Sequence, residues 1–284
     1  KESSMSANIL ASKIFRNFVC IFLCILSIIP FWIMIANATR TSVDIQAHFS
    51  LIPSTYLFEN FEKLLYQCNA NVPLYQYMIN SFIIAGFSTV ITVYFSSMTA
   101  YGVTVYKFRG VNAVWAFIMA IMMIPAQVSI IGFMQLMMKI GLYNTYVPLI
   151  VPAIAAPSTY YFMKQYMEAG LSIEIVEAAR IDGSNEFKTF NSIVLPLMKP
   201  AMATQAIFAF IASWNNLFTP SMILIDKTKN TLPMFVQTLR SEQFRSDYGM
   251  IYLGLFITVL PIFVVYFALS KYIIAGVALG GVKE

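Results

Sequence analysis

Residues 177–196 read EAARIDGSNEFKTFNSIVLP and form a polar stretch between two long apolar segments. Just before this stretch, Ser172 is a good N-cap, and Glu174 would lie in the first turn of a helix, where the helix dipole favours an anion. Asp182-Gly183 favours the end of that helix, because glycine readily adopts the left-handed conformation. The stretch therefore predicts a helix that stops at a glycine.

A second short helix is predicted directly after the glycine. Ser184 can cap it, with Glu186 in its first turn, and Leu195-Pro196 is expected to stop it. Together the two helices make a compact helix-turn-helix at a membrane surface. Its mixture of acidic, basic and apolar side chains does not indicate a substrate-binding site. It favours a docking surface that binds in a groove of another protein.

The composition indicates an integral membrane protein. The chain is 59% hydrophobic and 11% charged, whereas soluble domains carry about 25% charged residues. Its apolar segments reach the ~20 residues that a membrane helix needs, and they lack the short alternating pattern of barrel strands. The three cysteines and the single histidine have no metal-ligand spacing. We therefore expect an all-α membrane protein with no catalytic residue, metal or cofactor in this chain.

Six apolar segments are predicted to cross the membrane as helices. They cover approximately residues 17–38, 77–105, 112–138, 146–163, 200–225 and 249–270. The fourth segment carries Pro148, Pro152 and Pro157, so it should be kinked or partly unwound, with neighbouring helices satisfying the freed carbonyls.

The predicted spans divide the chain into three regions. Residues 1–76 hold the N-terminal tail, the first span and an outer polar loop from about residue 39 to 75; residues 77–273 form the transmembrane core with the polar loop 164–199; residues 274–284 form a glycine-rich tail. With six spans, eleven of the 18 Lys and Arg residues fall on the side that holds both termini and the 164–199 loop. This side is predicted to be cytoplasmic by the positive-inside rule.

The polar stretch also carries a spaced pattern, E-A-A, three residues, Gly, nine residues, Ile-x-Leu-Pro. Its members are Glu177, Ala178, Ala179, Gly183, Ile193, Leu195 and Pro196. The pattern resembles the signature loop of ABC importer permeases. That resemblance implies a coupling helix, with Arg180 and Asp182 inside it, that docks into a cleft of a separate ATPase subunit. The alternative is a solvated connector in which Glu177 pairs with Arg180 one turn on.

The resemblance extends from about residue 80 to the C-terminus, and there it is to the maltose-permease-like carbohydrate-uptake branch. The matching segments are MIPAQV at 123–128, GLYNTY at 141–146, IDG at 181–183, SWNN at 213–216, TLP at 231–233 and AGVALGGVK at 275–283. It implies that the tail, with Gly276, Gly280, Gly281 and Lys283, also contacts the ATPase. The chain departs from the branch at Gly170-Leu171-Ser172, where many relatives have a proline, and at its last residue, Glu284.

Two absences bear on the source of energy. The six predicted spans contain no Asp, Glu, Lys or Arg, whereas ion-coupled carriers usually keep an ionisable residue inside the membrane. The sequence also has no G-x-x-x-x-G-K-[ST] phosphate loop. ATP and Mg²⁺ are therefore expected on a partner chain.

A neutral polar pathway suits a solute such as a sugar, which binds through hydrogen bonds and stacking on aromatic rings. Each candidate could equally be a packing or membrane-interface residue. The candidates are Gln127, Ser129, Tyr160, Tyr161, Trp214, Asn215 and Asn216.

These patterns lead to one main hypothesis and two alternatives. The resemblance implies a permease subunit of an ATP-driven sugar or oligosaccharide importer in the bacterial cytoplasmic membrane. Its expected partners are a second homologous permease, two ATPase subunits and an extracytoplasmic solute-binding protein. The alternatives are an ABC permease for a non-sugar solute and a secondary carrier that works alone.

Reconstitution separates the carrier hypothesis from the importer hypotheses. Under the importer hypotheses, the purified chain alone in lipid vesicles is expected to give no solute flux above that of empty vesicles, because the partner permease and the ATPase that switches the pathway are missing. Flux measured for the chain alone, without ATP, would support the carrier.

Overall fold

The computed structural model describes residues 2–69, 72–106, 108–241 and 247–280, and every regular element in this part of the chain is a helix. The helices fall into two compact units, each described here by itself. The first unit holds residues 1–70 and 236–259, and the second holds residues 71–235 and 260–284.

Helices α1, α2 and α3 belong to the first unit, and α14 and α15 contribute to both. Their bounds are α1 (Glu2–Ala38), α2 (Ser42–Ala47), α3 (Leu57–Asn69), α14 (Leu232–Ser241) and α15 (Tyr248–Gly280). The remaining elements belong to the second unit: α4 (Leu74–Val105), α5 (Val111–Met122), α6 (Ala126–Lys139), α7 (Val147–Ile150), η1 (Val151–Ile154), α8 (Pro157–Gly170), α9 (Ile173–Ile181), α10 (Glu186–Thr189), η2 (Phe190–Val194), α11 (Leu195–Leu197), α12 (Lys199–Trp214), α13 (Phe218–Ile223) and η3 (Lys227–Lys229).

Three described helices are long and apolar enough to cross a membrane. They comprise Ser12–Ala38 of α1, the whole of α4 and Tyr248–Ser270 of α15. A bent pair, Glu186–Leu197 followed by Lys199–Trp214 at 82°, makes a fourth if it counts as one span. The predicted third and fourth spans are divided into shorter helices, and prolines stand at these breaks.

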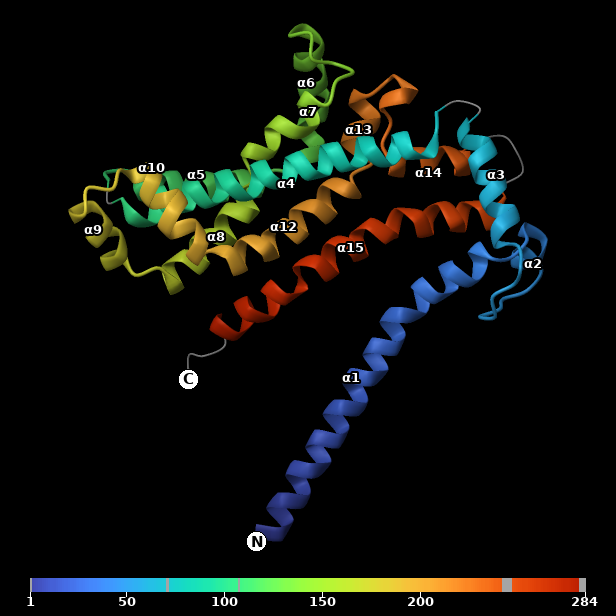
Figure 1. Cartoon of the computed structure of the whole chain (residues 1–284), viewed down its shortest axis with the longest axis horizontal. Coiled ribbons are helices and arrows are strands. Elements are labelled where there is room, and N and C mark those ends of the chain that lie inside the picture. Colours follow the sequence, from blue (N-terminus) through green and yellow to red (C-terminus); the bar gives the residue numbers. More distant parts are fainter. Residues whose placement is uncertain (1, 70–71, 107, 242–246, 281–284) are drawn as a thin grey trace. The chain divides into compact units, whose positions relative to one another are not determined.

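Helix α4 is the centre of the second unit. It packs against α12, α8, α7 and η1, and Figure 1 shows α12 running alongside it. Its buried face is rich in small polar residues: Asn80, Ser81, Ser88, Thr92, Ser96 and Ser97. Small side chains let neighbouring backbones approach closely, which is how helices pack where no water drives them together.

The proline-rich fourth segment is unwound, as the sequence predicts. It consists of α7, the 3₁₀ turn η1 and α8, with Pro157 beginning α8. Because proline has no N–H, Pro157 leaves the carbonyl of Ala153 without its usual helical donor. The Thr92 hydroxyl of α4 donates to that carbonyl at 2.9 Å, and Ser88 donates to the carbonyl of Leu149 at 3.2 Å. A neighbouring helix thus satisfies the freed carbonyls, which confirms the prediction.

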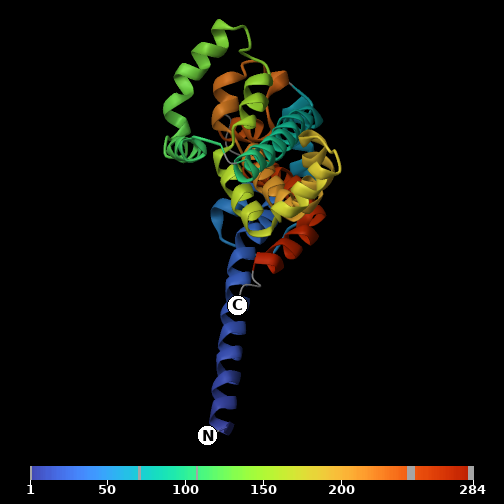
Figure 2. The same cartoon turned by 90° about the vertical axis from the view of Figure 1, so that its left-hand side faces the viewer.

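The predicted third span is interrupted at Pro125, where α5 ends and α6 begins. Pro125 has an extended backbone with ψ of 125°, and it serves as the N-cap of α6. Figure 2 shows α6 leaving the end of α5 at a steep angle.

The polar segment after α1 is more ordered than a simple loop, because it contains α2 and α3. Within the first unit, Asn60 of α3 is buried and donates to the carbonyls of Ala38 at 2.9 Å and Arg40 at 3.0 Å. Its amide therefore ties α3 to the end of α1, and Gly249 at the start of α15 lies against the same groups.

Substitution of Gly249 by alanine should destabilise the protein. The added Cβ would lie 2.4 Å from the carbonyl oxygen of Arg40 and 2.6 Å from Nδ2 of Asn60. The Asn60 amide cannot easily move away, because it donates two hydrogen bonds to backbone carbonyls. We expect Gly249→Ala to lower the free energy of unfolding by about 1–3 kcal/mol, the usual cost of overpacking. Denaturation in detergent would measure the change.

Gly86→Ala is the matched control, because no atom lies within 4 Å of the added Cβ at this position of α4. It should raise the free energy of unfolding by about 0.5–1 kcal/mol, since alanine is the better helix former. Equal effects of the two substitutions would contradict the packing described for Gly249.

Candidate functional site: the polar loop and a neutral cavity

The polar loop forms two helices joined by a glycine turn, as predicted. Helix α9 begins after Ser172 and ends at Ile181, with Asp182 as its C-cap residue. Gly183 has φ of 75°, and its N–H donates to the carbonyl of Arg180 at 3.0 Å, while the N–H of Ser184 donates to Ala179 at 2.9 Å. This pair of bonds is a Schellman motif, which explains why glycine is needed at this position. Ser172 occupies the N-cap position but makes no side-chain capping bond.

Two sequence predictions for the second helix are wrong. The cap of α10 is Asn185, whose side-chain oxygen accepts from the N–H of Lys188 at 2.8 Å, and Ser184 lies one residue earlier. Leu195-Pro196 does not stop the helix, since α10 continues through the π-helical turn η2 into α11. Pro196 follows the π-helical turn η2, where the N–H of Leu195 donates to the carbonyl of Phe190, five residues back. The chain bends afterwards, before α12.

Helix α9 has a buried face and an exposed face. Val176 is fully buried in a core cluster with residues of α4, α8, η2 and α12, and Ala179 is 6% exposed. Glu177 and Ala178 are exposed, and Ile181 is 87% exposed. The E-A-A motif therefore divides: Ala179 packs inward, whereas Glu177 and Ala178 share the open face with a large apolar side chain.

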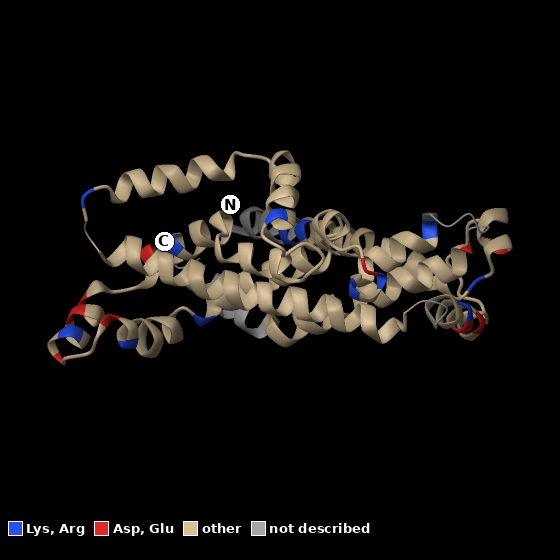
Figure 3. Ribbon diagram, turned by 90° about the horizontal axis from the view of Figure 1, so that it is seen from above, with Lys and Arg blue, Asp and Glu red and all other residues tan. Residues whose placement is uncertain are grey.

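The remaining motif residues connect the loop to the core. Ile193 and Leu195 are half-buried, Pro196 is exposed, and Leu195 packs against the core cluster around Val176. Phe187 of α10 is 69% exposed, so the loop presents a second large apolar side chain besides Ile181. Figure 3 shows charged residues gathered on α9 and α10, while α4 and α12 carry almost none.

Arg180 pairs with Glu186 rather than with Glu177. Nε of Arg180 lies 2.7 Å from Oε1 of Glu186, and the hydroxyl of Tyr101 donates to Oε2 at 2.8 Å. The guanidinium also lies over the ring of Tyr106, 5.5 Å from its centroid. The Arg180 hydrogen bond, with help from Tyr106 and Tyr101, lowers the pKa of Glu186 from 4.5 to about 2.

The C-terminal tail can be placed only in part. Gly276 and Gly280 lie in the last turns of α15. Gly281 and Lys283 lie outside the described residues.

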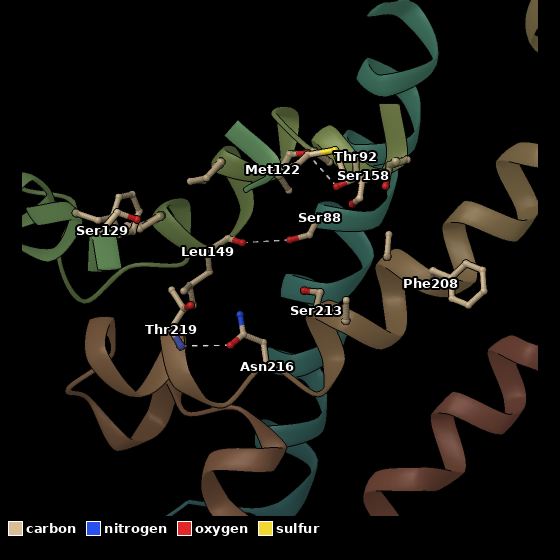
Figure 4. A pocket seen from close by; sticks show the side chains of 18 of the residues that line it. Ser88, Thr92, Met122, Ser129, Leu149, Ser158, Phe208, Ser213, Asn216 and Thr219 are labelled. Carbon is tan, nitrogen blue, oxygen red and sulfur yellow. Dashed lines mark hydrogen bonds between the residues drawn. The ribbon is translucent and has the colours of Figure 1, made fainter. Parts of the chain in front are cut away.

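A cavity of about 1200 Å³ lies in the second unit. Residues of α4, α6 and α12 line it, together with the broken fourth segment formed by α7, η1 and α8. Figure 4 shows hydroxyl and amide side chains in its wall. The polar lining residues are Ser88, Thr92, Ser129, Ser158, Thr159, Gln205, Ser213, Asn216 and Thr219. Among the described residues that line it, none is Asp, Glu, Lys, Arg or His.

The cavity contains some of the residues predicted for a solute pathway. Ser129, Tyr161 and Asn216 line it. Trp214 instead lies in the core, 1% exposed and stacked on Phe210 with ring centroids 5.4 Å apart, and Tyr160 is 3% exposed. Asn215, the exposed C-cap residue of α12, is not among the lining residues, and the side chain of Gln127 lies outside the described part of the chain.

Sequence reasoning missed the contribution of α4 to the cavity. Ser88 and Thr92 line it, and with Ser96 they recur every four residues on one face of an otherwise apolar helix. This spacing places hydroxyls in one stripe, so the signal was present in the sequence. Gln205 is a second missed residue, and it is isolated within an apolar run.

Comparison with known proteins identifies the family. Residues 93–278 match the family described as binding-protein-dependent transport system inner membrane component. The chain belongs to this family. In this family the ATPase is a separate subunit.

Curated relatives of the permease cover nearly its whole length. It is 34% identical to the arabinooligosaccharides transport system permease protein AraQ of Halalkalibacterium halodurans, over 92% of this chain and 93% of the relative. It is 30% identical to the melibiose/raffinose/stachyose import permease protein MelC of Bacillus subtilis, over 90% of this chain and 91% of the relative.

A solved structure supports the fold. The permease resembles a chain of a bacterial ABC transporter that imports the acidic polysaccharide alginate, with a TM-score of 0.77. The match covers 93% of this chain and 98% of that chain at 20% identity. At this identity the likeness concerns the fold alone.

The Glu186 ion pair should respond to acid but not to pH near neutrality. A lowered pKa means that its stabilisation is fully present above pH 4.5 and is lost as the pH falls towards 2. We expect Glu186→Gln to lower the melting temperature by about 1–4 °C, as for a partly exposed pair. The difference from the wild type should stay constant from pH 8 to 5 and narrow below pH 4.5. A difference that grows on acidification would contradict the pairing.

Proposed function

We propose that this permease is one transmembrane subunit of an importer that carries a sugar or oligosaccharide into a bacterial cell, powered by ATP hydrolysis on a separate subunit. The family membership supports the importer, and the names of the relatives support the solute class. ATP-driven movement of the polar loop would switch the transmembrane helices between inward- and outward-facing states.

The exposed face of α9 is the single observation that carries the coupling role. Ile181 at the end of α9 and Phe187 on α10 are large apolar side chains, 87% and 69% exposed, and such exposed apolar side chains on a polar loop suit a surface that a partner covers. Beside them, Glu177 and Ala178 add a charge and a flat surface at which a partner backbone can come close. An ATPase cleft that receives α9 as a helix in a groove would bury this face.

The cavity supports an uncharged solute. Its hydroxyls and amides offer donors and acceptors for sugar hydroxyls, and Tyr161 offers an aromatic ring on which a sugar face can stack. A carboxylated or cationic solute would find no counter-charge among the described lining residues. Ser129, Tyr161 and Asn216 are therefore our proposed pathway residues, joined by Ser88, Thr92 and Gln205.

The six-span topology is part of the proposal. We assign the third span to α5 with α6, the fourth to α7, η1 and α8, and the fifth to α12 with α13. Short helices can cross together, because breaks are tolerated where backbone lines a cavity or lies within protein. Both termini and α9 would then be cytoplasmic, with residues 1–76, 77–273 and 274–284 as the three regions.

The remaining partners follow from this assembly. We propose a second homologous permease, two ATPase subunits that hold ATP and Mg²⁺, and an extracytoplasmic binding protein that delivers the saccharide. The glycine-rich tail, with Gly276, Gly280, Gly281 and Lys283, would follow the ATPase surface.

Ile181→Asp tests the docking face. A buried charge in the cleft should weaken the ATPase complex by about tenfold or more, since truncating or opposing a central apolar contact costs ~2 kcal/mol or more. The measurement is the amount of ATPase that co-purifies with the permease. Because Ile181 is 87% exposed, the melting temperature of the isolated permease should hardly change.

Ile52→Asp is the matched control, because Ile52 is 76% exposed and lies in the segment predicted to be outside the cell. It should leave ATPase co-purification unchanged. Unchanged co-purification in the Ile181 variant as well would remove the basis for the docking face.

A further inference from the structure

The carboxylate of Glu186 joins three elements of the second unit. Its Oε1 binds Arg180 at the end of α9, and its Oε2 accepts from the hydroxyl of Tyr101 on α4, 2.8 Å away. Glu186 itself begins α10. Both oxygens are thus used in charge-assisted hydrogen bonds, which are shorter and stronger than neutral ones.

Residues that follow Glu186 strengthen the same attachment to α4. Phe190 is 2% exposed, and its ring lies 5.4 Å from that of Tyr101 and 5.8 Å from that of Tyr94. The hydroxyl of Tyr94 donates to Oδ1 of Asn191 at 3.2 Å. Tyr94 and Tyr101, about two helical turns apart on α4, therefore both contact the turn η2 that follows α10.

The same helix continues to the cavity. Ser88 and Thr92 line the cavity wall, and Ser88 lies 13 residues before Tyr101, or ~20 Å along a helix that rises 1.5 Å per residue. Pro and helix breaks are absent from α4 between these positions, which all lie in its described part. The helix is therefore continuous from the contact with the loop to the cavity wall.

We propose that Glu186 is a positioning residue that couples the polar loop to α4, so that displacement of α9 by the ATPase reaches the cavity wall through Tyr101. This proposal rests on the docking role proposed above for α9. The Arg180 pair makes α9 and α10 move together, and the Tyr101 bond passes that movement to α4. Without the carboxylate, the packing of Phe190 and the Tyr94–Asn191 bond remain, but the polar link from Arg180 of α9 to Tyr101 of α4 is lost.

The alternative is that Glu186 only stabilises the fold. The two roles differ in what they affect: a structural residue changes melting and assembly, whereas a positioning residue changes the response of the cavity to nucleotide. Tyr101→Phe is the sharpest variant, because it removes one hydroxyl, keeps the ring against Phe190 and leaves every loop residue intact.

The experiment uses the whole complex of both permeases and the ATPase in lipid vesicles. In a background of Cys20→Ala and Cys24→Ala, which removes the two exposed thiols, Ser158→Cys places one thiol at the cavity wall. The rate of its reaction with a charged maleimide is measured with and without MgATP and vanadate. The same complex without the Ser158 substitution gives the background from Cys68.

In the reporter complex, nucleotide should change the labelling rate by about fivefold or more, the size typical of coupling between sites. Tyr101→Phe and Glu186→Gln should each remove most of this change while the ATPase still co-purifies. The double variant should lose no more than either single variant, since both break one pathway. Glu168→Gln, which breaks the ion pair to Lys164 on α8, is the matched control and should behave like the parent.

A full nucleotide response in Tyr101→Phe would overturn the proposal. If Glu186→Gln prevents assembly of the complex, the labelling rates of the Tyr101→Phe complex alone test the proposal. A reporter complex that hydrolyses ATP with no change in labelling would instead overturn the proposed function, because no movement would reach the cavity by any route.

Discussion

The second unit depends on one constraint, which is that a backbone carbonyl inside a membrane needs a hydrogen-bond donor. The prolines of the fourth segment remove such donors, and the hydroxyls of Thr92 and Ser88 replace them from α4. These bonds hold the broken segment against α4, and residues of α7, η1 and α8 line the cavity beside them. The unwound backbone and the cavity are thus two results of one arrangement.

Helix α4 connects the features that matter for function. Its middle lines the cavity, and its last turns hold Phe190 and Glu186 of the loop through aromatic and charged contacts. The cavity and the loop are both built on short or broken helices, whereas α4 runs unbroken for 32 residues. In the mechanism proposed above, this continuous helix would join the ATPase contact to the solute path.

Local patterns predicted much of the fold and part of the site. Composition indicated the membrane, the proline spacing indicated the unwound fourth segment, and Gly183 indicated the turn because only a left-handed residue closes the Schellman motif. The cap at Asn185 and the continuation through Pro196 were mispredicted. Ser184 and Asn185 are both good caps, and a proline in a first turn looks in sequence like a proline that ends a helix.

The sequence by itself determined the class of protein, the two helices of the polar loop with their glycine turn and the absence of charge from the predicted spans, since these follow from composition and short-range spacing. Only the tertiary structure decided which polar residues share the cavity and that Glu186 binds Arg180 and Tyr101. Tyr101 and Glu186 are 85 residues apart. Such a contact depends on how α4 and α10 pack, and no periodicity within either segment records it.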